Sequence, residues 1–258
     1  MIAAVVQQRE LFASMLRREV RQRYKGSVLG ILWSLVTPLV MMGAYTLVFS
    51  LIFTTVPFAH YPAFLLTGLS VWVFFAGGLE AGTASIVASA NLVKKVAFER
   101  SIVPLATTMS HLVTFGAMIA VLVPLNLVLQ PGTRTTMILL PALIVCLVVM
   151  TAGLALALSA LNVYFRDVQH ILGILLLAWY FLTPVLFSVS VLDDRPEQLR
   201  LLYLNPMTAV IVSYQRALLD GLPPQWDALA YSAGVAIVLF IVGFWYFDRS
   251  KDDFESAL

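Results

Sequence analysis

The sequence has 258 residues, of which 60% are hydrophobic and 12% charged, and its formal net charge is +2. A soluble domain carries about 25% charged residues, so this chain is too poor in charge to cover a water-facing surface. A single cysteine, Cys146, excludes a disulfide framework and a multi-thiolate metal site. The histidines lie far apart without metal-ligand spacing, so no metal site and no bound cofactor are expected in this chain.

Residues 8–25 are too charged to cross a membrane, yet apolar side chains such as Leu11 and Met15 recur there at helical spacing. The pattern predicts an amphipathic helix that lies in the inner interface of the membrane, with its arginines at anionic headgroups. These arginines are Arg17, Arg18, Arg21 and Arg23. The simpler alternative is a helical anchor that only fixes the topology.

Six apolar runs are long enough to cross a bilayer, which takes about 20 residues per helix. They cover residues 29–53, 61–88, 104–129, 136–161, 170–192 and 228–247. Any one run could be a buried helix of a soluble protein, but six together predict an all-α integral membrane protein with six transmembrane helices. We expect a single transmembrane domain over residues 1–258.

The second run contains Glu80, an acidic residue well inside a span. Such residues are costly in a membrane and usually face the bundle interior or a water-filled space. Gly78 and Gly82 flank it at a spacing that favours close helix contact. A structural hydrogen bond across a helix pair therefore explains Glu80 equally well.

Two short links join consecutive runs on the same side of the membrane. Residues 91–101 (NLVKKVAFERS) have a narrow apolar face, but their composition favours a solvated loop. Residues 162–170 (NVYFRDVQH) combine a polar cap, two aromatic residues and an adjacent Arg–Asp pair. Short membrane loops rarely need such varied chemistry, although a helix cap with an exposed salt bridge, worth about 1 kcal/mol or less, also explains it.

The longest segment outside the runs lies between the fifth and the sixth. Residues 193–197 suit the start of a short helix, and Asn205 then offers an N-cap followed by Pro206 at the first helical position. Gly221 can end this second helix. Residues 207–219 are apolar but too few to cross, which predicts re-entrant outer helices covered by protein or water. A helix on the membrane surface is the alternative.

The basic residues set the orientation, because Lys and Arg concentrate in cytoplasmic loops. With the N-terminus inside, 12 of the 16 basic residues are cytoplasmic: Arg9, Arg17, Arg18, Arg21, Arg23, Lys25, Lys94, Lys95, Arg100, Arg166, Arg249 and Lys251. The outer segments hold Arg134, Arg195, Arg200 and Arg216. We therefore expect both termini in the cytoplasm.

Four motifs, in order and at fixed places relative to the runs, resemble those of a known family. They are RYKGSVLG at 23–30 leading to Trp33 and Pro38, NLVKK at 91–95, NVYFRD at 162–167 and LNP at 204–206. The chain resembles the ABC-2 transmembrane subunits that export O-antigen, teichoic acid, capsule or galactan precursors. The family often has a proline before the arginine at 100, where this chain has Glu99, which leaves the local backbone open.

The resemblance implies a homodimer in the bacterial inner or plasma membrane that moves lipid-linked polysaccharide outward. It also implies a separate ABC ATPase subunit that binds ATP and Mg²⁺, and the sequence agrees because it has no G-x-x-x-x-G-K-[ST] phosphate loop. The chain is thus expected to be a transport subunit and not an enzyme, with membrane lipids but no nucleic acid among its partners. The residues expected to couple the ATPase to the membrane helices are Asn91, Lys94, Lys95, Glu99, Arg100, Asn162, Phe165, Arg166 and Asp167.

A polysaccharide path needs weak contacts at many points, so that the polymer can slide. Aromatic faces suit the C–H surfaces of sugars, and single polar groups suit their hydroxyls. The candidate pathway residues are Phe53, Tyr61, Trp72, Glu80, Trp179 and Tyr180. Aromatic residues also form membrane-interface belts and cores, which is the alternative for each ring.

Two other functions fit part of the pattern. An ABC-2 exporter of a small hydrophobic drug or haem shares the fold but should not need the 162–167 motif. A membrane glycosyltransferase or ligase needs acids, bases or a metal at the membrane surface. The outer segment offers Asp193, Asp194, Arg195 and Glu197 without an evident constellation.

Overall fold

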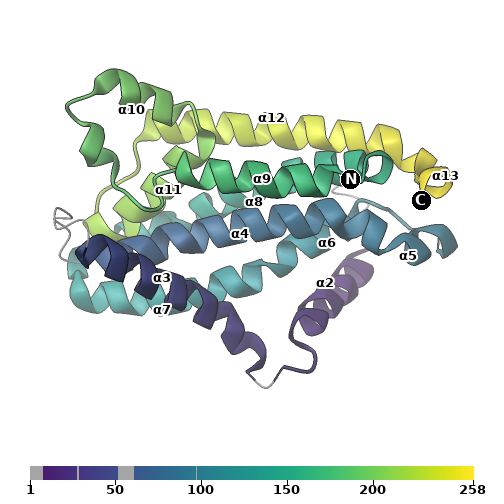
Figure 1. Ribbon diagram of the computed structural model, residues 1–258, viewed down its shortest axis with the longest axis horizontal. Coiled ribbons are helices and arrows are strands. Elements are labelled where there is room, and N and C mark those ends of the chain that lie inside the picture. The colour runs from purple at the N-terminus through teal and green to yellow at the C-terminus, as the bar shows by residue number, and fades with distance from the viewer. Residues whose placement is uncertain (1–7, 28, 52–60, 97) are drawn as a thin grey trace.

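The computed structural model describes residues 8–27, 29–51, 61–96 and 98–258, and the elements that these residues form are helices and helical turns (Figure 1). The α-helices are α2 (Arg9–Tyr24), α3 (Trp33–Leu51), α4 (Tyr61–Ala88), α5 (Ala90–Lys95), α6 (Ile102–Ser110), α7 (Leu112–Leu129), α8 (Leu140–Tyr164), α9 (Val168–Phe181), α10 (Pro196–Tyr203), α11 (Pro206–Gln215), α12 (Trp226–Ser250) and α13 (Phe254–Ala257). The prediction of an all-helical protein is confirmed.

Within the described residues, four helical stretches are long and apolar enough to cross a membrane: Tyr61–Ala88, Ile102–Val128, Gly132–Tyr164 and Trp226–Asp253. They correspond to the second, third, fourth and sixth predicted runs. Two shorter apolar helices, Leu35–Phe49 and Val168–Phe181, lie in the first and fifth runs. The last residues of the first run, 52 and 53, lie outside the described residues.

The fifth predicted run, 170–192, extends beyond the helix that the structure contains. Helix α9 ends at Phe181, and residues 189–192 form a separate 3-10 turn. Pro184 disfavours a helical backbone at Thr183, so the helix ends before this pair. The apolar pattern continues past the break through Leu182, Val185 and Leu186, so hydropathy gives no sign that the helix ends.

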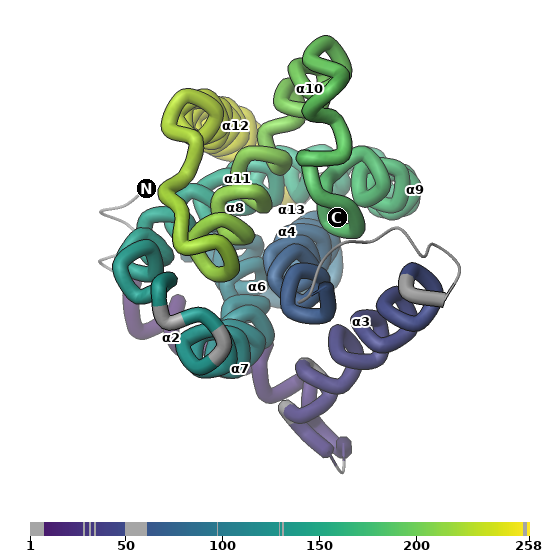
Figure 2. The backbone as a smooth tube through the Cα atoms, turned by 90° about the vertical axis from the view of Figure 1, so that its left-hand side faces the viewer, coloured from purple at the N-terminus to yellow at the C-terminus, as the bar shows by residue number. Residues whose placement is uncertain are grey.

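Helix α4 lies at the centre of the bundle, in contact with α3, α6, α7, α8, α9 and α11 (Figure 2). In the most apolar stretch of 18 residues of each helix, 78% of the residues are buried in α4 and 17% are buried in α12. On α12, apolar side chains such as Ile241 and Trp245 are exposed. Since a helix that presents apolar side chains outward needs an apolar solvent, α12 has the surface expected of a helix in contact with lipid.

Glycines allow the helices to approach closely. A Cβ at Gly82 would overlap Thr108 Oγ1 and lie 2.8 Å from the Ala155 Cβ, and a Cβ at Gly78 would lie 3.3 Å from the Thr108 Cγ2. The predicted close contact through this glycine pair is therefore confirmed. Between α8 and α12, a Cβ at Gly243 would overlap the carbonyl oxygen of Gly153, so these two helices also pack backbone against backbone.

The bundle has two ends of different construction. At one end, here called the inner end, α13 packs against α5 and the end of α8, beside the turn that leads to α9. At the other, here called the outer end, α10 and α11 follow the irregular segment after α9 (Figure 1). The two links predicted on one side of the membrane thus lie at the same end of the bundle.

Candidate transport cavity and coupling surface

A cavity of about 720 Å³ opens between the end of α2, the α6–α7 junction and helices α3, α4 and α9. Its lining residues are Arg23, Tyr24, Ser27, Trp33, Thr37, Pro38, Met41, Tyr45, Leu69, Trp72, Val73, Ala76, Gly77, Glu80, His111, Thr114, Gly173, Leu176, Leu177 and Tyr180. The lining part of α4 runs from Leu69 to Glu80, which spans about 16 Å at 1.5 Å per residue. The cavity is thus an elongated space along the central helix.

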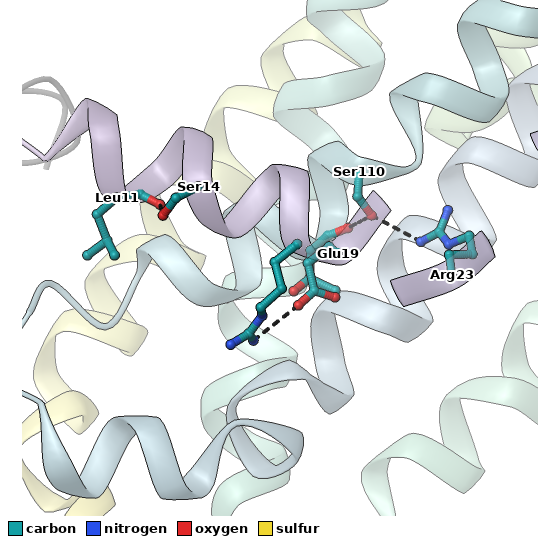
Figure 3. Close-up of polar contacts among 7 residues, drawn as sticks. Leu11, Ser14, Glu19, Arg23 and Ser110 are labelled. Atoms are coloured by element: carbon teal, nitrogen blue, oxygen red, sulfur yellow. Dashed lines mark hydrogen bonds and ion pairs between the residues drawn. The ribbon is translucent and has the colours of Figure 1, made fainter. Parts of the chain in front are cut away.

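The inner part of the cavity is polar. The Arg23 guanidinium, at the end of α2, donates a hydrogen bond to Ser110 Oγ at 3.0 Å (Figure 3). The hydroxyls of Tyr24 and Thr114 are 3.2 Å apart. Glu80 is exposed on this stretch of α4, so a guanidinium and a carboxylate both face the same space.

The junction between α6 and α7 places the His111 ring against α4. The predicted third run, 104–129, is divided at His111, where α6 ends and α7 begins. The His111 ring packs so closely on α4 that a Cβ at Gly77 would lie 2.8 Å from its Cε1 and Nδ1 atoms. The glycine therefore makes room for an imidazole inside the bundle.

The outer part of the cavity is aromatic. The Trp72 ring lies 5.5 Å from the Tyr180 ring and 6.5 Å from the Trp179 ring, and Phe75 packs edge-on against Trp179 at 5.1 Å. Trp72 and Tyr180 line the cavity, whereas Trp179 does not line it and packs against Trp72. Trp179 Nε1 donates to Asn205 Oδ1 at 2.8 Å, which links the cavity to the outer end.

The predicted pathway residues are only partly brought together. Trp72, Glu80 and Tyr180 line one cavity, and Trp179 packs against the ring of Trp72. Tyr61 lies elsewhere: its hydroxyl donates to the Leu186 carbonyl at 2.9 Å and its ring packs with Phe64. Phe53 lies outside the described residues.

Several lining residues were not identified from the sequence as pathway candidates. The sequence predicts that Arg23 contacts lipid headgroups, and it does not indicate a place in the transport pathway for His111, Trp33 or Tyr45. The motif at 23–30 marked the end of α2, but which way Arg23 points depends on the packing of α2 along α6. No pattern within either segment carries that information.

The α2 helix matches its predicted range of 8–25 and packs along α6, with Met15 buried. Arg17, Arg18 and Arg21 are exposed and, with Lys25, line a groove of about 560 Å³. The remaining lining residues, Ser14 and Gln22, carry no charge. Arg18 also forms an ion pair with Glu19 at 3.3 Å. These arginines therefore form a cationic face that is separate from the contact made by Arg23.

The first inner link is partly helical, contrary to the expected solvated loop. Residues 90–95 form α5, because Val93 is buried and fixes one face of the segment. Lys94 and Lys95 are exposed. Asn91 borders a second cavity between α2, α4 and α6. Glu99 and Arg100 both contact Lys251, beyond α12.

The second inner link is a short exposed turn between α8 and α9. Phe165 is 64% exposed, and Arg166 and Asp167 are exposed beside it. Asn162, in contrast, is buried within α8 and its Oδ1 has no hydrogen-bond partner among the described residues. The turn thus presents an aromatic ring and two opposite charges, while Asn162 faces the core.

The predicted start and end of the second helix in the outer segment are confirmed. Asn205 caps α11 by accepting a hydrogen bond from the Met207 amide at 3.0 Å, and Pro206 is the first helical residue. A π-helical turn, Arg216–Asp220, extends α11, and Gly221 ends it in the left-handed region at φ +64°. All residues from Met207 to Gln215 are buried. Protein therefore covers this helix.

Together, these features define a helical membrane protein with an internal amphipathic cavity and a partly charged inner surface. Residues 10–219 match the model of the ABC-2 type transporter family. The match spans most of the chain, and the chain belongs to this family.

Relatives with assigned names match along nearly the whole chain. The O-antigen export system permease protein RfbA of Myxococcus xanthus is 29% identical, over 100% of this chain and 99% of its own length. A permease of the same name from Klebsiella pneumoniae is 29% identical over 96% of this chain and 95% of its own length. The polysialic acid transport protein KpsM of Escherichia coli is 25% identical over 88% of each chain.

Proposed function

We propose that this chain is the permease subunit of an ABC exporter that moves lipid-linked polysaccharide from the cytoplasmic to the outer side of the bacterial inner or plasma membrane. The observation that carries the proposal is its end-to-end similarity to permeases named for O-antigen export. The cavity supports it, because a glycan needs both aromatic faces and groups that bind hydroxyls. Trp72 and Tyr180 offer the first, and Arg23 and Glu80 offer the second.

In this proposal the inner end of the bundle is cytoplasmic. Helices α3 and α9, with their neighbouring residues, are the first and fifth of six spans, and α10 and α11 form the re-entrant outer segment. The charge distribution supports this orientation, because 12 of the 16 basic residues fall in segments assigned to the inner side. A single cysteine at position 95 in a Cys146→Ser background should react with an impermeant maleimide only after the membrane is opened. Labelling in intact cells would refute the orientation.

The energy comes from a separate ATPase subunit that binds ATP and Mg²⁺. Its docking surface is α5 together with the 164–167 turn, where Lys94, Lys95, Phe165 and Arg166 are exposed. Two copies of the chain form the working unit, with the cavities of both copies contributing to one route. Affinity purification of the chain should recover an ABC ATPase and a 2:2 complex by mass.

Transport is tested directly in reconstituted vesicles that contain the complex and a lipid-linked glycan. ATP should drive the glycan to the far side of the membrane. Transport of a small hydrophobic dye without any glycan movement would favour the small-molecule exporter instead. Depletion of the chain in cells should cause the lipid-linked glycan to accumulate on the cytoplasmic side, which would also identify the sugar.

A further inference from the structure

The residues that follow α12 bend back over the inner end of the bundle. Residues 248–254, here called the hook, comprise the last turn of α12, a 3-10 turn and the start of α13. From the sequence, the only prediction for these residues is that Arg249 and Lys251 help to set the orientation in the membrane. In the structure they contact both inner links.

The first set of contacts joins the hook to the link after α5. Lys251 Nζ lies 3.5 Å from Glu99 Oε2 and 2.6 Å from Asp248 Oδ1. The neighbouring Arg100 donates a hydrogen bond to the Lys251 carbonyl oxygen. Two consecutive residues of the link therefore bind the side chain and the main chain of the same hook residue. The Lys251 and Glu99 side chains are only 26% and 20% exposed, so water screens this pair less than an exposed one.

The second set of contacts joins the hook to the turn after α8. The Tyr164 hydroxyl donates to the Ser250 carbonyl at 3.3 Å, and the Tyr164 ring lies 6.4 Å from the Phe254 ring. Phe254 is fully buried and packs edge-on against the fully buried Phe247 at 5.3 Å. The aromatic anchor fixes the hook in the hydrophobic core, so it is not a loose tail.

We propose that the hook is a strut that holds the two inner links in one rigid arrangement, with Lys251 as its positioning residue. The proposal rests on the proposed function, in which an ATPase acts on both links. If the links moved independently, closure of the ATPase could shift one link without the other. Part of the conformational change of the ATPase would then not reach the membrane helices. Lys251 holds Glu99 and Arg100, and Phe254 holds Tyr164. Because of these contacts the two links move together, and their movement is transmitted to α4 and α8.

The test uses the full complex with its ATPase in vesicles, and compares Lys251→Met with Lys251→Arg. We expect Lys251→Met to lower the amount of glycan moved per ATP hydrolysed by about two- to fivefold, the population change that one such ion pair supports, while ATP turnover persists. Lys251→Arg should retain most of the coupling, because the charge remains. The matched control is Arg249→Met, which removes an adjacent cation that lies over the Trp245 ring, 5.6 Å from its centroid.

A second measurement is independent of the substrate. Spin labels at the exposed positions 95 and 166 report the distance between the links. The distance distribution should be narrow in the otherwise unchanged protein, broad with Lys251→Met, and equally broad with Glu99→Gln. The double variant should be no broader than Lys251→Met alone, because each single variant already removes the contact between Lys251 and Glu99.

The outcomes separate the two proposals. An unchanged distribution and an unchanged coupling ratio in Lys251→Met would overturn the strut, whatever the complex transports. Failure of the unmodified complex to move glycan would refute the proposed function, while the distance measurement would still support or overturn the strut.

Discussion

The outer and inner ends of this bundle are held together by different interactions. At the outer end, the Asn205 side chain makes four hydrogen bonds with uncharged partners, including Thr183 Oγ1 at 2.9 Å, and residues Met207 to Gln215 of α11 are buried. At the inner end, partly exposed charges hold the 91–101 link through Glu99, and the Phe165 side chain is exposed. Partly buried hydrogen bonds are costly to break when a partner is left unsatisfied, whereas ion pairs in contact with water contribute about 1 kcal/mol or less.

The difference indicates that the two ends have different mechanical roles. At the outer end, the buried and uncharged helix α11 resists displacement, which suits a fixed part of the outer mouth. The inner end presents charged groups and the aromatic ring of Phe165 at its surface, which suits a surface that a motor protein must bind and move as one body. The following substitutions test this comparison, beginning with the largest expected effect.

Replacing Asn205 with leucine should lower the free energy of unfolding by about 3 kcal/mol, through the lost helix cap and the unsatisfied Trp179 N–H. Asn205→Asp keeps the oxygen acceptors and loses the amide donors, so a smaller loss is expected. Thermal melting of the purified protein in detergent measures both. A loss below about 1 kcal/mol for the leucine variant would contradict the account of a rigid outer end.

Gly221→Ala should cost about 1–2 kcal/mol, because the residue is in the left-handed region and its Cβ would lie 3.2 Å from the Gly132 carbonyl oxygen. Gly234→Ala is the matched control within α12, where a Cβ meets nothing within 4 Å. The control should be neutral or slightly stabilising, since alanine is the better helix former. Equal melting temperatures for the two variants would show that the turn after α11 is not under conformational restraint.

The double variant Glu99→Ala with Arg100→Ala should change stability by about 1 kcal/mol or less, yet uncouple ATP hydrolysis from export. Folded yield and ATP turnover should persist while glycan export falls. Normal export would refute the coupling role, and a large loss of folded protein would refute the contrast between the two ends.

The smallest stability effect is expected in the cavity. Glu80→Gln keeps the shape of an exposed side chain and should alter stability by about 0.5 kcal/mol or less, but slow the export of long glycans. Tyr61→Phe is the comparison, because Tyr61 does not line the cavity. It should lose about 1 kcal/mol through its hydrogen bond to Leu186 and leave the rate per folded molecule unchanged. The reverse pattern would move the glycan path from the cavity to the region of Tyr61.

Local signals in the sequence predicted much of this structure. The second run, 61–88, coincides with α4. The cap at Asn205 and the left-handed helix end at Gly221 lie where these residue types predict them. Such features depend on residues within one turn of each other. The end of α9 at Phe181 was missed, although Pro184 was a readable signal, because hydropathy alone set the boundary.

The sites were predicted less completely, for a physical reason. The contact of Arg23 with Ser110, and that of Lys251 with Glu99, join residues far apart in the sequence. Their partners are decided by how helices pack, and composition or periodicity within one segment does not encode that choice. Tyr61 and Trp72 look alike as aromatic residues of the same helix, and only packing separates the cavity wall from the core.

Hydrogen exchange of the assembled complex, compared without nucleotide and with ATP trapped, tests the division between the two ends most directly. Backbone amides of residues 207–215 should exchange slowly and equally in both states, because this part of α11 is buried and uncharged. Exchange in residues 90–101 and 164–168 should change when ATP binds. A change confined to 207–215, with none in the two inner links, would contradict the account.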